Sequence, residues 1–136
     1  MRKLFWAAVL FCGGCSSPFI YAPNPQDVLD SSKAVQFSGL VARYEMGFSG
    51  VSVFDGHDVR LVVFGESGVK LADMRVTAGK TYVYYQLPKL PARAVKAFDT
   101  LARTYFFNVC PPEKILYYDK SLRADMEVRT QGVLCR

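Results

Sequence analysis

The sequence predicts a mostly-β domain of the α+β class: a curved antiparallel sheet, an unclosed half-barrel, packed on one amphipathic helix. Three observations predict it. Short segments of alternating apolar and polar residues follow one another from residue 35 to residue 87, separated by tight turn signals. One stretch of helical periodicity comes after them, at 91–107. Aromatic residues make up 14% of the chain, which suits a β-rich protein.

The predicted strands are short and closely spaced. They are joined by the turn sequences 46–47, 55–58, 65–68 and 78–79, all too short for a crossover. Consecutive strands are therefore expected to be antiparallel neighbours. The apolar parity of the fourth strand shifts near Ala72, which predicts a β-bulge or a bend there. The five strands are expected at 35–45, 48–54, 59–64, 69–77 and 80–87.

A segment bounded by prolines carries the predicted helix. Pro91 suits the first turn of a helix, and Pro111 and Pro112 follow its end. Apolar residues recur between them at three- and four-residue spacing, so the helix is expected to cover one face of the sheet. That apolar stripe consists of Val95, Phe98, Leu101, Ala102, Tyr105 and Phe106. Two or three more short strands are expected afterwards, from the segments 114–118, 122–130 and 132–135.

The start of the chain reads as an export signal that ends in a lipid-attachment site. Two basic residues precede the apolar run 4–11, which is far shorter than the ~20 residues that span a bilayer. The following sequence, Cys12-Gly-Gly-Cys15, resembles the lipobox of bacterial lipoproteins, where the signal is cut before a cysteine that is then lipidated. The resemblance implies a signal at 1–14 and a lipidated Cys15. Ordinary cleaved secretion and a CxxC redox or metal site are the alternatives.

The residues after the lipobox indicate where the domain begins and to which membrane the protein is sorted. Residues 15–34 are expected to be the lipidated cysteine and a tether, and 35–136 a single domain. Three prolines between Ser16 and Pro25 disfavour regular structure in the tether. In the enterobacterial lipoproteins that the chain resembles, a non-acidic residue such as Ser16 after the anchor goes with outer-membrane sorting. We therefore expect a protein on the outer membrane, anchored by lipid and facing the periplasm.

Two cysteines remain beyond the lipobox, Cys110 and Cys135. In an oxidising periplasm they are expected to form a disulfide. This bridge would close a loop of about 26 residues, which the chain-entropy model values at about 3.5 kcal/mol. Two free buried thiols, or one reactive thiol, are the alternatives.

No pattern for bond chemistry stands out. The one histidine, His57, sits in a hairpin-turn sequence, and no glycine-rich stretch has nucleotide-binding spacing. Asp119, Asp125 and Glu127 carry no sign of a shared cleft. The basic residues behind the net charge of +5 are scattered, which argues against nucleic acid and allows mild attraction to anionic lipid headgroups. We expect no enzyme activity, no cofactor and no metal.

Tyrosines exceed what an ordinary core needs. Tyr82 and Tyr84 share one face of their strand, and Tyr85 lies on the other. Such side chains either line a groove or pack against neighbouring strands.

A repeated tripeptide points to a known architecture. Phe37-Ser-Gly39 recurs as Phe48-Ser-Gly50, and the run 48–76 places glycine-containing turns before apolar strands. This rhythm resembles the outer-membrane lipoprotein receptor and carrier family across residues 35–107. The resemblance implies an unclosed half-barrel whose concave, apolar interior binds acyl chains under a helical lid.

The anchor and the resemblance lead us to expect binding of an acyl chain, a lipid or a lipidated partner at the outer membrane, without bond chemistry. The alternative is a structural or adaptor lipoprotein with a solid core, which binds another envelope protein through a sheet edge or an aromatic patch. Volume separates the two, because a carrier needs an apolar cavity of at least ~300 Å³. Strand parity and the helix stripe give these candidate lining residues: Val41, Val53, Leu61, Val63, Leu71, Tyr84, Phe98 and Leu101.

Overall fold

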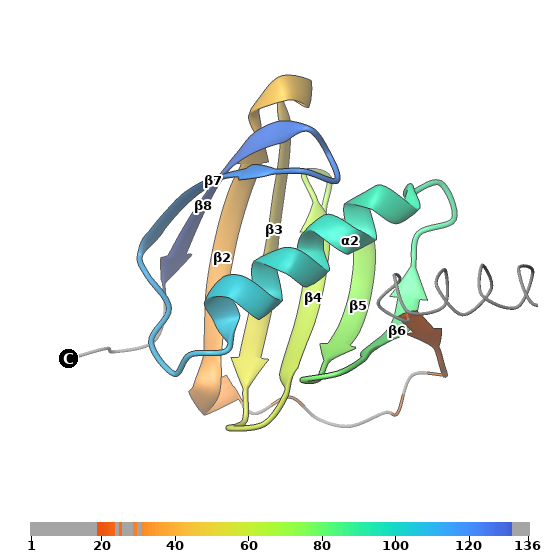
Figure 1. The fold of residues 1–136 in the computed structure, drawn as a ribbon, viewed down its shortest axis with the longest axis vertical. Helices are drawn as coiled ribbons and strands as arrows, with labels where there is room; N and C mark the ends of the chain where they lie inside the picture. Colours follow the sequence, from red (N-terminus) through yellow and green to blue (C-terminus); the bar gives the residue numbers. More distant parts are fainter. Residues whose placement is uncertain (1–18, 24, 26–28, 30, 132–136) are drawn as a thin grey trace, which may run out of the picture.

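The computed structural model describes residues 19–23, 25, 29 and 31–131, which form one eight-stranded sheet and one helix. The helix α2 (Ala92–Leu101) continues into a π-helical turn, η3 (Ala102–Phe106), and lies across one face of the sheet (Figure 1). The predicted fold class is confirmed. The strands are β1 (Phe19–Tyr21), β2 (Ala34–Val41), β3 (Met46–Phe54), β4 (Val59–Gly65), β5 (Lys70–Val76), β6 (Thr81–Gln86), β7 (Lys114–Asp119) and β8 (Ala124–Gln131).

The strand order is β1-β6-β5-β4-β3-β2-β8-β7. As predicted from the short connections, the strands from β2 to β6 are consecutive antiparallel neighbours. The chain returns after the helix, and β8 then pairs with β2 while β7 forms one edge. The expected last strand, 132–135, lies outside the described residues.

The first expected strand is shorter than predicted, and the second is longer. The alternation that suggested a strand to residue 45 stops at Val41, where a 3₁₀ turn, η2 (Ala42–Tyr44), begins. Glu45 closes this turn in a left-handed conformation with φ 51°, and its N–H donates to the Ala42 carbonyl. Met46 and Gly47 then belong to β3 instead of interrupting the alternation.

The expected tether contains a strand that sequence analysis missed. Phe19, Ile20 and Tyr21 pair in parallel with Thr81, Tyr82 and Val83, respectively, so β1 extends the sheet beyond β6. A further bond runs from the Ala22 N–H to the Val83 carbonyl at 3.1 Å, and Phe19 packs against the hydrophobic core. The prolines around β1 do not prevent three residues of pairing because the strand lies at the edge of the sheet.

The predicted β-bulge is confirmed. Val63 pairs with Ala72 and Phe64 pairs with Lys70, so Leu71 is the extra residue of β5. A second irregularity, which was not predicted, leaves Tyr84 unopposed in β6. Bulges increase local twist and therefore help a sheet to curl around a helix.

Asp55 organises the hairpin between β3 and β4. Its carboxylate accepts hydrogen bonds from the backbone N–H groups of His57 and Asp58, both at 2.8 Å. The bond from Asp58 and, to a smaller extent, the bond from His57 lower the pKa of the Asp55 carboxyl below its ordinary value. Gly56 has a φ of 99°, which a glycine adopts without strain. His57 is accordingly an exposed turn residue.

The repeated Phe-Ser-Gly tripeptide has a structural basis in the register of β2 and β3. Phe37 pairs with Gly50, and Gly39 pairs with Phe48. A Cβ added at Gly39 would meet the Phe48 ring at 2.3 Å, and one added at Gly50 would meet the Phe37 ring at 2.5 Å. Each phenylalanine therefore lies over the glycine of the other copy, which lets two large rings pack against the sheet backbone.

Cys110 is disulfide-bonded, and its partner lies outside the described residues, as do Cys135 and both lipobox cysteines. The predicted pairing with Cys135 remains a prediction. Nearby bonds favour it: Thr130 near the end of β8 donates to the carbonyls of Glu113 and Pro112, at 2.9 and 2.6 Å. The chain that leads to Cys135 therefore starts beside the segment that holds Cys110.

Candidate functional site: an apolar pocket at the start of the helix

An apolar pocket of about 140 Å³ opens where the helix begins. Leu90, Pro91, Ala94 and Phe98 contribute from the helix and the loop before it. The opposite wall comes from the turn between β2 and β3, from the bulge of β5 and from the β7–β8 connection. These wall residues are Val41, Tyr44, Met46, Gly47, Phe48, Leu71 and Leu122, and Arg93 completes the lining.

The predicted lining residues divide into three groups. Val41, Leu71 and Phe98 do line the pocket. Three others, Leu61, Val63 and Leu101, are fully buried in the solid hydrophobic core beyond it. The structure does not bring Val53 and Tyr84 to this site.

Val53 and Tyr84 lie on the outer face of the sheet. The alternation of residues along a strand separates two faces but does not say which face meets the helix. Val53 pairs with Arg60, which alternates with the core residue Leu61 along β4. Tyr84 is the bulged residue of β6, and the Arg60 guanidinium lies over its ring at 4.8 Å. When alternate residues are counted on past a turn or a bulge, outer residues are assigned to the inner face, and this is why Val53 and Tyr84 were predicted wrongly as lining residues.

Sequence reasoning missed the pocket residues that come from turns and loops. Tyr44 belongs to the β2–β3 turn and Met46 is the first residue of β3 directly after it; Met46 is 54% exposed although it is apolar. Leu90 comes from the Leu-Pro-Lys-Leu-Pro loop before the helix. Apolar side chains in a turn were the available signal, since turns are usually polar.

The interior beyond the pocket is filled by a row of four phenylalanine rings. Ring centroids lie 5.5 Å apart for Phe98 and Phe48, 6.3 Å for Phe48 and Phe37, and 5.2 Å for Phe37 and Phe106. The row leads from the apolar pocket toward the end of the helix. A solid core, rather than a continuous channel, therefore occupies the middle of the half-barrel.

A second pocket, of about 290 Å³, lies at the far end of this row, where Phe106 contributes to its wall. Its lining mixes apolar residues, such as Val35 and Phe54, with polar ones, such as Lys33 and Asp55. It is therefore less apolar than the pocket at the start of the helix.

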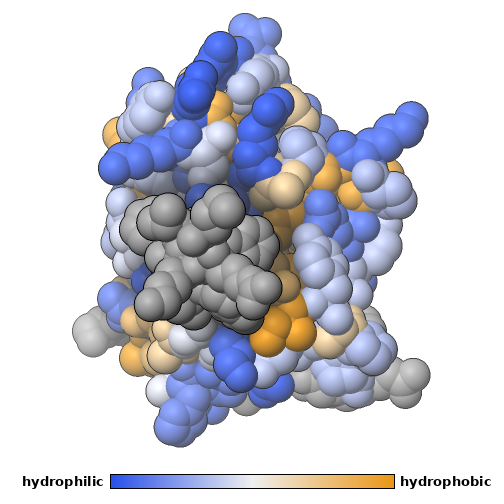
Figure 2. Space-filling view, turned by 45° about the vertical axis from the view of Figure 1, so that its right-hand side comes forward, coloured by the Kyte–Doolittle hydropathy of each residue, from blue (hydrophilic) through white to orange (hydrophobic). Residues whose placement is uncertain are grey.

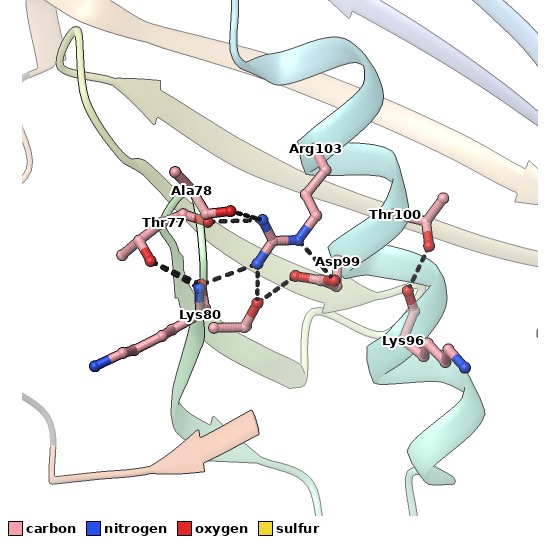
Figure 3. Close-up of polar contacts among 8 residues, drawn as sticks. Thr77, Ala78, Lys80, Lys96, Asp99, Thr100 and Arg103 are labelled. Carbon is pink, nitrogen blue, oxygen red and sulfur yellow. Dashed lines mark hydrogen bonds and ion pairs between the residues drawn. The ribbon is translucent and has the colours of Figure 1, made fainter. Parts of the chain in front are cut away.

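Polar contacts fix the second half of the helix to the β5–β6 turn (Figure 3). The Arg103 guanidinium donates to the carbonyls of Thr77 and Lys80 at 2.6 and 2.9 Å, and to the Thr81 hydroxyl at 2.8 Å. Asp99 pairs with Arg103 at 3.1 Å and accepts from the Thr81 hydroxyl. We call these contacts the Arg103 clasp.

The Arg103 clasp constrains how the site could open. Asp99 and Thr81 are buried, so the helix cannot lift here without exposing these charged and polar groups to solvent or leaving them without hydrogen-bond partners. Just before the helix, the Gln86 side-chain amide donates to the Leu90 carbonyl at 2.9 Å, and the helix residues Ala94 and Phe98 that line the pocket are apolar. A lid that moves as a whole is therefore disfavoured.

Positive charge lies at the mouth of the pocket. Arg93 is an exposed lining residue on the first turn of α2. Arg43 lies over the ring of Tyr44 at 5.6 Å and donates to the Arg123 carbonyl. An apolar hollow with cations at its rim is complementary to an amphiphile with an anionic head.

The acidic residues considered as catalytic candidates in the sequence do not share a cleft. The buried Asp119 carboxylate accepts from the Leu122 N–H at 2.8 Å, which shapes the β7–β8 turn, whereas Asp125 is exposed. Burial raises the pKa of the neighbouring Tyr117 phenol, with smaller contributions from Asp119 and Tyr105. No group of three metal-ligating side chains occurs within the described part of the chain.

Among the residues that the structure describes, no helix has the length and apolar character that a membrane crossing requires. Figure 2, which brings the right-hand side of Figure 1 forward, shows a narrow band of hydrophobic surface between hydrophilic residues.

Comparison of the chain with protein-family models, curated proteins and solved structures gives no match.

Proposed function

We propose that this protein is a lipid-anchored, periplasm-facing protein of the outer membrane that binds the apolar chain of a lipid or of a lipidated partner. The observation that carries the proposal is the apolar pocket at the start of the helix, open to solvent beside the exposed Met46. The protein performs no bond chemistry in this proposal. Cys15 carries the anchor, and several acyl chains there make the attachment durable.

The size of the pocket sets how a chain binds. At about 140 Å³ it does not reach the ~300 Å³ required of a carrier that encloses a whole ligand, and it is close to the ~150 Å³ apolar cavity that holds a benzene ring. The pocket therefore receives the end of a chain. The rest of the chain lies across Tyr44 and Met46, where the mouth is apolar.

The cations at the mouth favour an anionic headgroup. Arg93 is exposed and can pair with a carboxylate or phosphate bound outside the pocket. Such a contact is solvent-exposed and contributes little affinity by itself, so the apolar chain supplies most of it. We therefore expect binding to persist in salt.

Ala94→Met tests this function. Ala94 lines the pocket, so the longer side chain fills it, and affinity for a fluorescent fatty-acid probe falls at least tenfold with little loss of stability. The measurement is a probe titration on the unlipidated Cys15→Ala protein, with urea unfolding of each variant.

Ala97→Met is the matched control. Ala97 is fully buried in the solid core and does not line the pocket, so the extra volume destabilises the fold by about 1–3 kcal/mol without a specific effect on binding. Wild-type protein that binds no acyl probe, or an Ala94→Met variant that binds as well as wild type, contradicts the proposal.

A second candidate function rests on the edge strand β7. Leu116 and Tyr118 are 63% and 57% exposed there, and with Leu40 they line a shallow groove of about 420 Å³. Within the described sheet β7 pairs only with β8, so its outer edge can accept another strand. This is the adaptor alternative: another envelope protein adds an extended segment along β7. Retention of partner binding by Ala94→Met and its loss in Leu116→Glu would favour it.

A further inference from the structure

The distance between the lipid anchor and the folded domain is short. Strand β1 begins at Phe19, only four residues after Cys15. Four residues span at most about 14 Å even when fully extended. Because β1 is paired with β6, an anchor at Cys15 holds this edge of the sheet close to the bilayer.

The side chains at this edge suit a membrane interface. Tyr21, Tyr84 and Tyr85 line one groove beside β1, of about 570 Å³, together with Leu87. Tyr21 is 61% exposed, and its hydroxyl donates to Gln86 at 2.7 Å. Tyrosine is enriched at the headgroup level of membranes because its ring is apolar and its hydroxyl is polar.

Cations accompany these tyrosines. The Lys70 ammonium lies 5.7 Å from the centre of the Tyr85 ring, and the Arg60 guanidinium lies over Tyr84. Arg60 and Lys70 both pair with the buried Asp73, at 2.7 and 3.7 Å, so the two cations exceed the one carboxylate. The Lys70 side chain is 39% exposed, and its ammonium can also reach lipid phosphates. Basic and aromatic side chains at one edge match an anionic headgroup layer.

We propose that the β1–β6 edge, defined by Tyr21, Tyr84, Tyr85 and Lys70, is the membrane-facing surface of the anchored domain. This inference rests on the lipid anchor of the proposed function and adds a fixed orientation to it. The partner is a lipid surface that contains anionic headgroups. The opposite edge of the sheet, β7, is then expected farther from the bilayer, since seven strand spacings of ~4.8 Å put about 34 Å, measured along the curved sheet, between the two edges.

Single-tryptophan variants test the orientation. Trp6 is the only tryptophan of the chain and belongs to the expected signal, so Tyr21→Trp and Tyr118→Trp each give the mature protein one fluorescent reporter. The two positions have nearly the same exposure, 61% and 57%, and lie at opposite edges. Each lipidated variant is reconstituted into vesicles that contain phosphatidylglycerol and lipids with brominated acyl chains, which quench tryptophan at short range.

The expected result is strong quenching of the tryptophan at position 21 and little at position 118. Tyr85→Trp gives a second reporter at the same edge if Tyr21→Trp disturbs the pairing of β1. Equal quenching at both edges, or none at either edge while the N-terminal peptide carries acyl mass, overturns the orientation alone. Absence of acyl mass on that peptide overturns the orientation together with the lipid anchor, and the mass measurement separates the two failures.

Discussion

At the residue scale, two glycines decide how the aromatic row packs. Gly39 and Gly50 occupy equivalent places in the repeated tripeptide, yet their surroundings differ. The nearest atoms to a Cβ at Gly39 all belong to the Phe48 ring, which is a side chain and can shift without moving the backbone of a neighbouring strand. A Cβ at Gly50 would lie 2.2 Å from the Val62 carbonyl oxygen, which belongs to the backbone of the next strand. The sequence repeat is symmetrical, whereas the packing is not.

Gly50→Ala is therefore expected to destabilise the fold by about 3 kcal/mol, and Gly39→Ala by only about 1 kcal/mol. The reason is that the backbone of β4 must move in the first case, and only a side chain in the second. Urea unfolding of both variants measures the difference. Equal losses, or a larger loss for Gly39→Ala, would contradict this account of the repeat.

Tyr117 provides a prediction of pH dependence. Burial raises the pKa of its phenol above the unfolded value of about 10, so its neutral form favours the folded state. The resulting stability is fully present below pH ~10 and is lost as the pH rises from there toward the folded pKa. Tyr117→Phe should therefore lose less stability than wild type between pH 8 and pH 11. Denaturant unfolding at several pH values checks this, and parallel curves for the two proteins would contradict it.

At the scale of elements, the helix has two halves with different roles. Its second half is fixed by the Arg103 clasp, and its first half borders the pocket through apolar residues. The resemblance to lipid carriers implied a lid. The contacts favour a helix that stays in place.

Arg103→Met tests the clasp. Loss of the guanidinium leaves the buried Asp99 carboxylate without its cation, which should cost about 3 kcal/mol or more. Thr100→Ala is the control on the same helix, because its hydroxyl only bonds the Lys96 carbonyl at an exposed position, and it should change stability by less than about 0.5 kcal/mol. Removing both charges with Asp99→Leu in the Arg103→Met background should restore part of the loss. A double variant no more stable than Arg103→Met would count against the clasp.

Local signals predicted the elements well because each depends on neighbouring residues. Turn residues fixed the order and pairing of the meander, and the parity shift at Ala72 located a bulge. The missed strand β1 depends on pairing with residues some sixty positions away, which no local pattern reports. Face assignment failed at Val53 and Tyr84 for a similar reason: alternation gives two faces, and only the tertiary fold says which one meets the helix.

At the scale of the whole molecule, three surfaces with different properties lie at different places on one sheet. The β1–β6 edge begins four residues after the proposed anchor, the concave face holds the apolar pocket, and the β7 edge carries exposed apolar side chains. A protein so arranged can sit on a membrane by one edge and still offer its pocket to a chain that approaches from the side. The pocket and the β7 edge support different functions, so one measurement should compare them directly.

Methyl-resolved NMR of the unlipidated protein, titrated with a medium-chain fatty acid, compares them most directly. We expect saturable shifts of the methyl groups of Leu71, Leu90 and Leu122 in the pocket, while the methyl groups of Val59 and Val76 in the solid core stay unchanged. Shifts confined to Leu40 and Leu116 at the β7 side, or no shifts at saturating fatty acid, would contradict a chain-binding pocket.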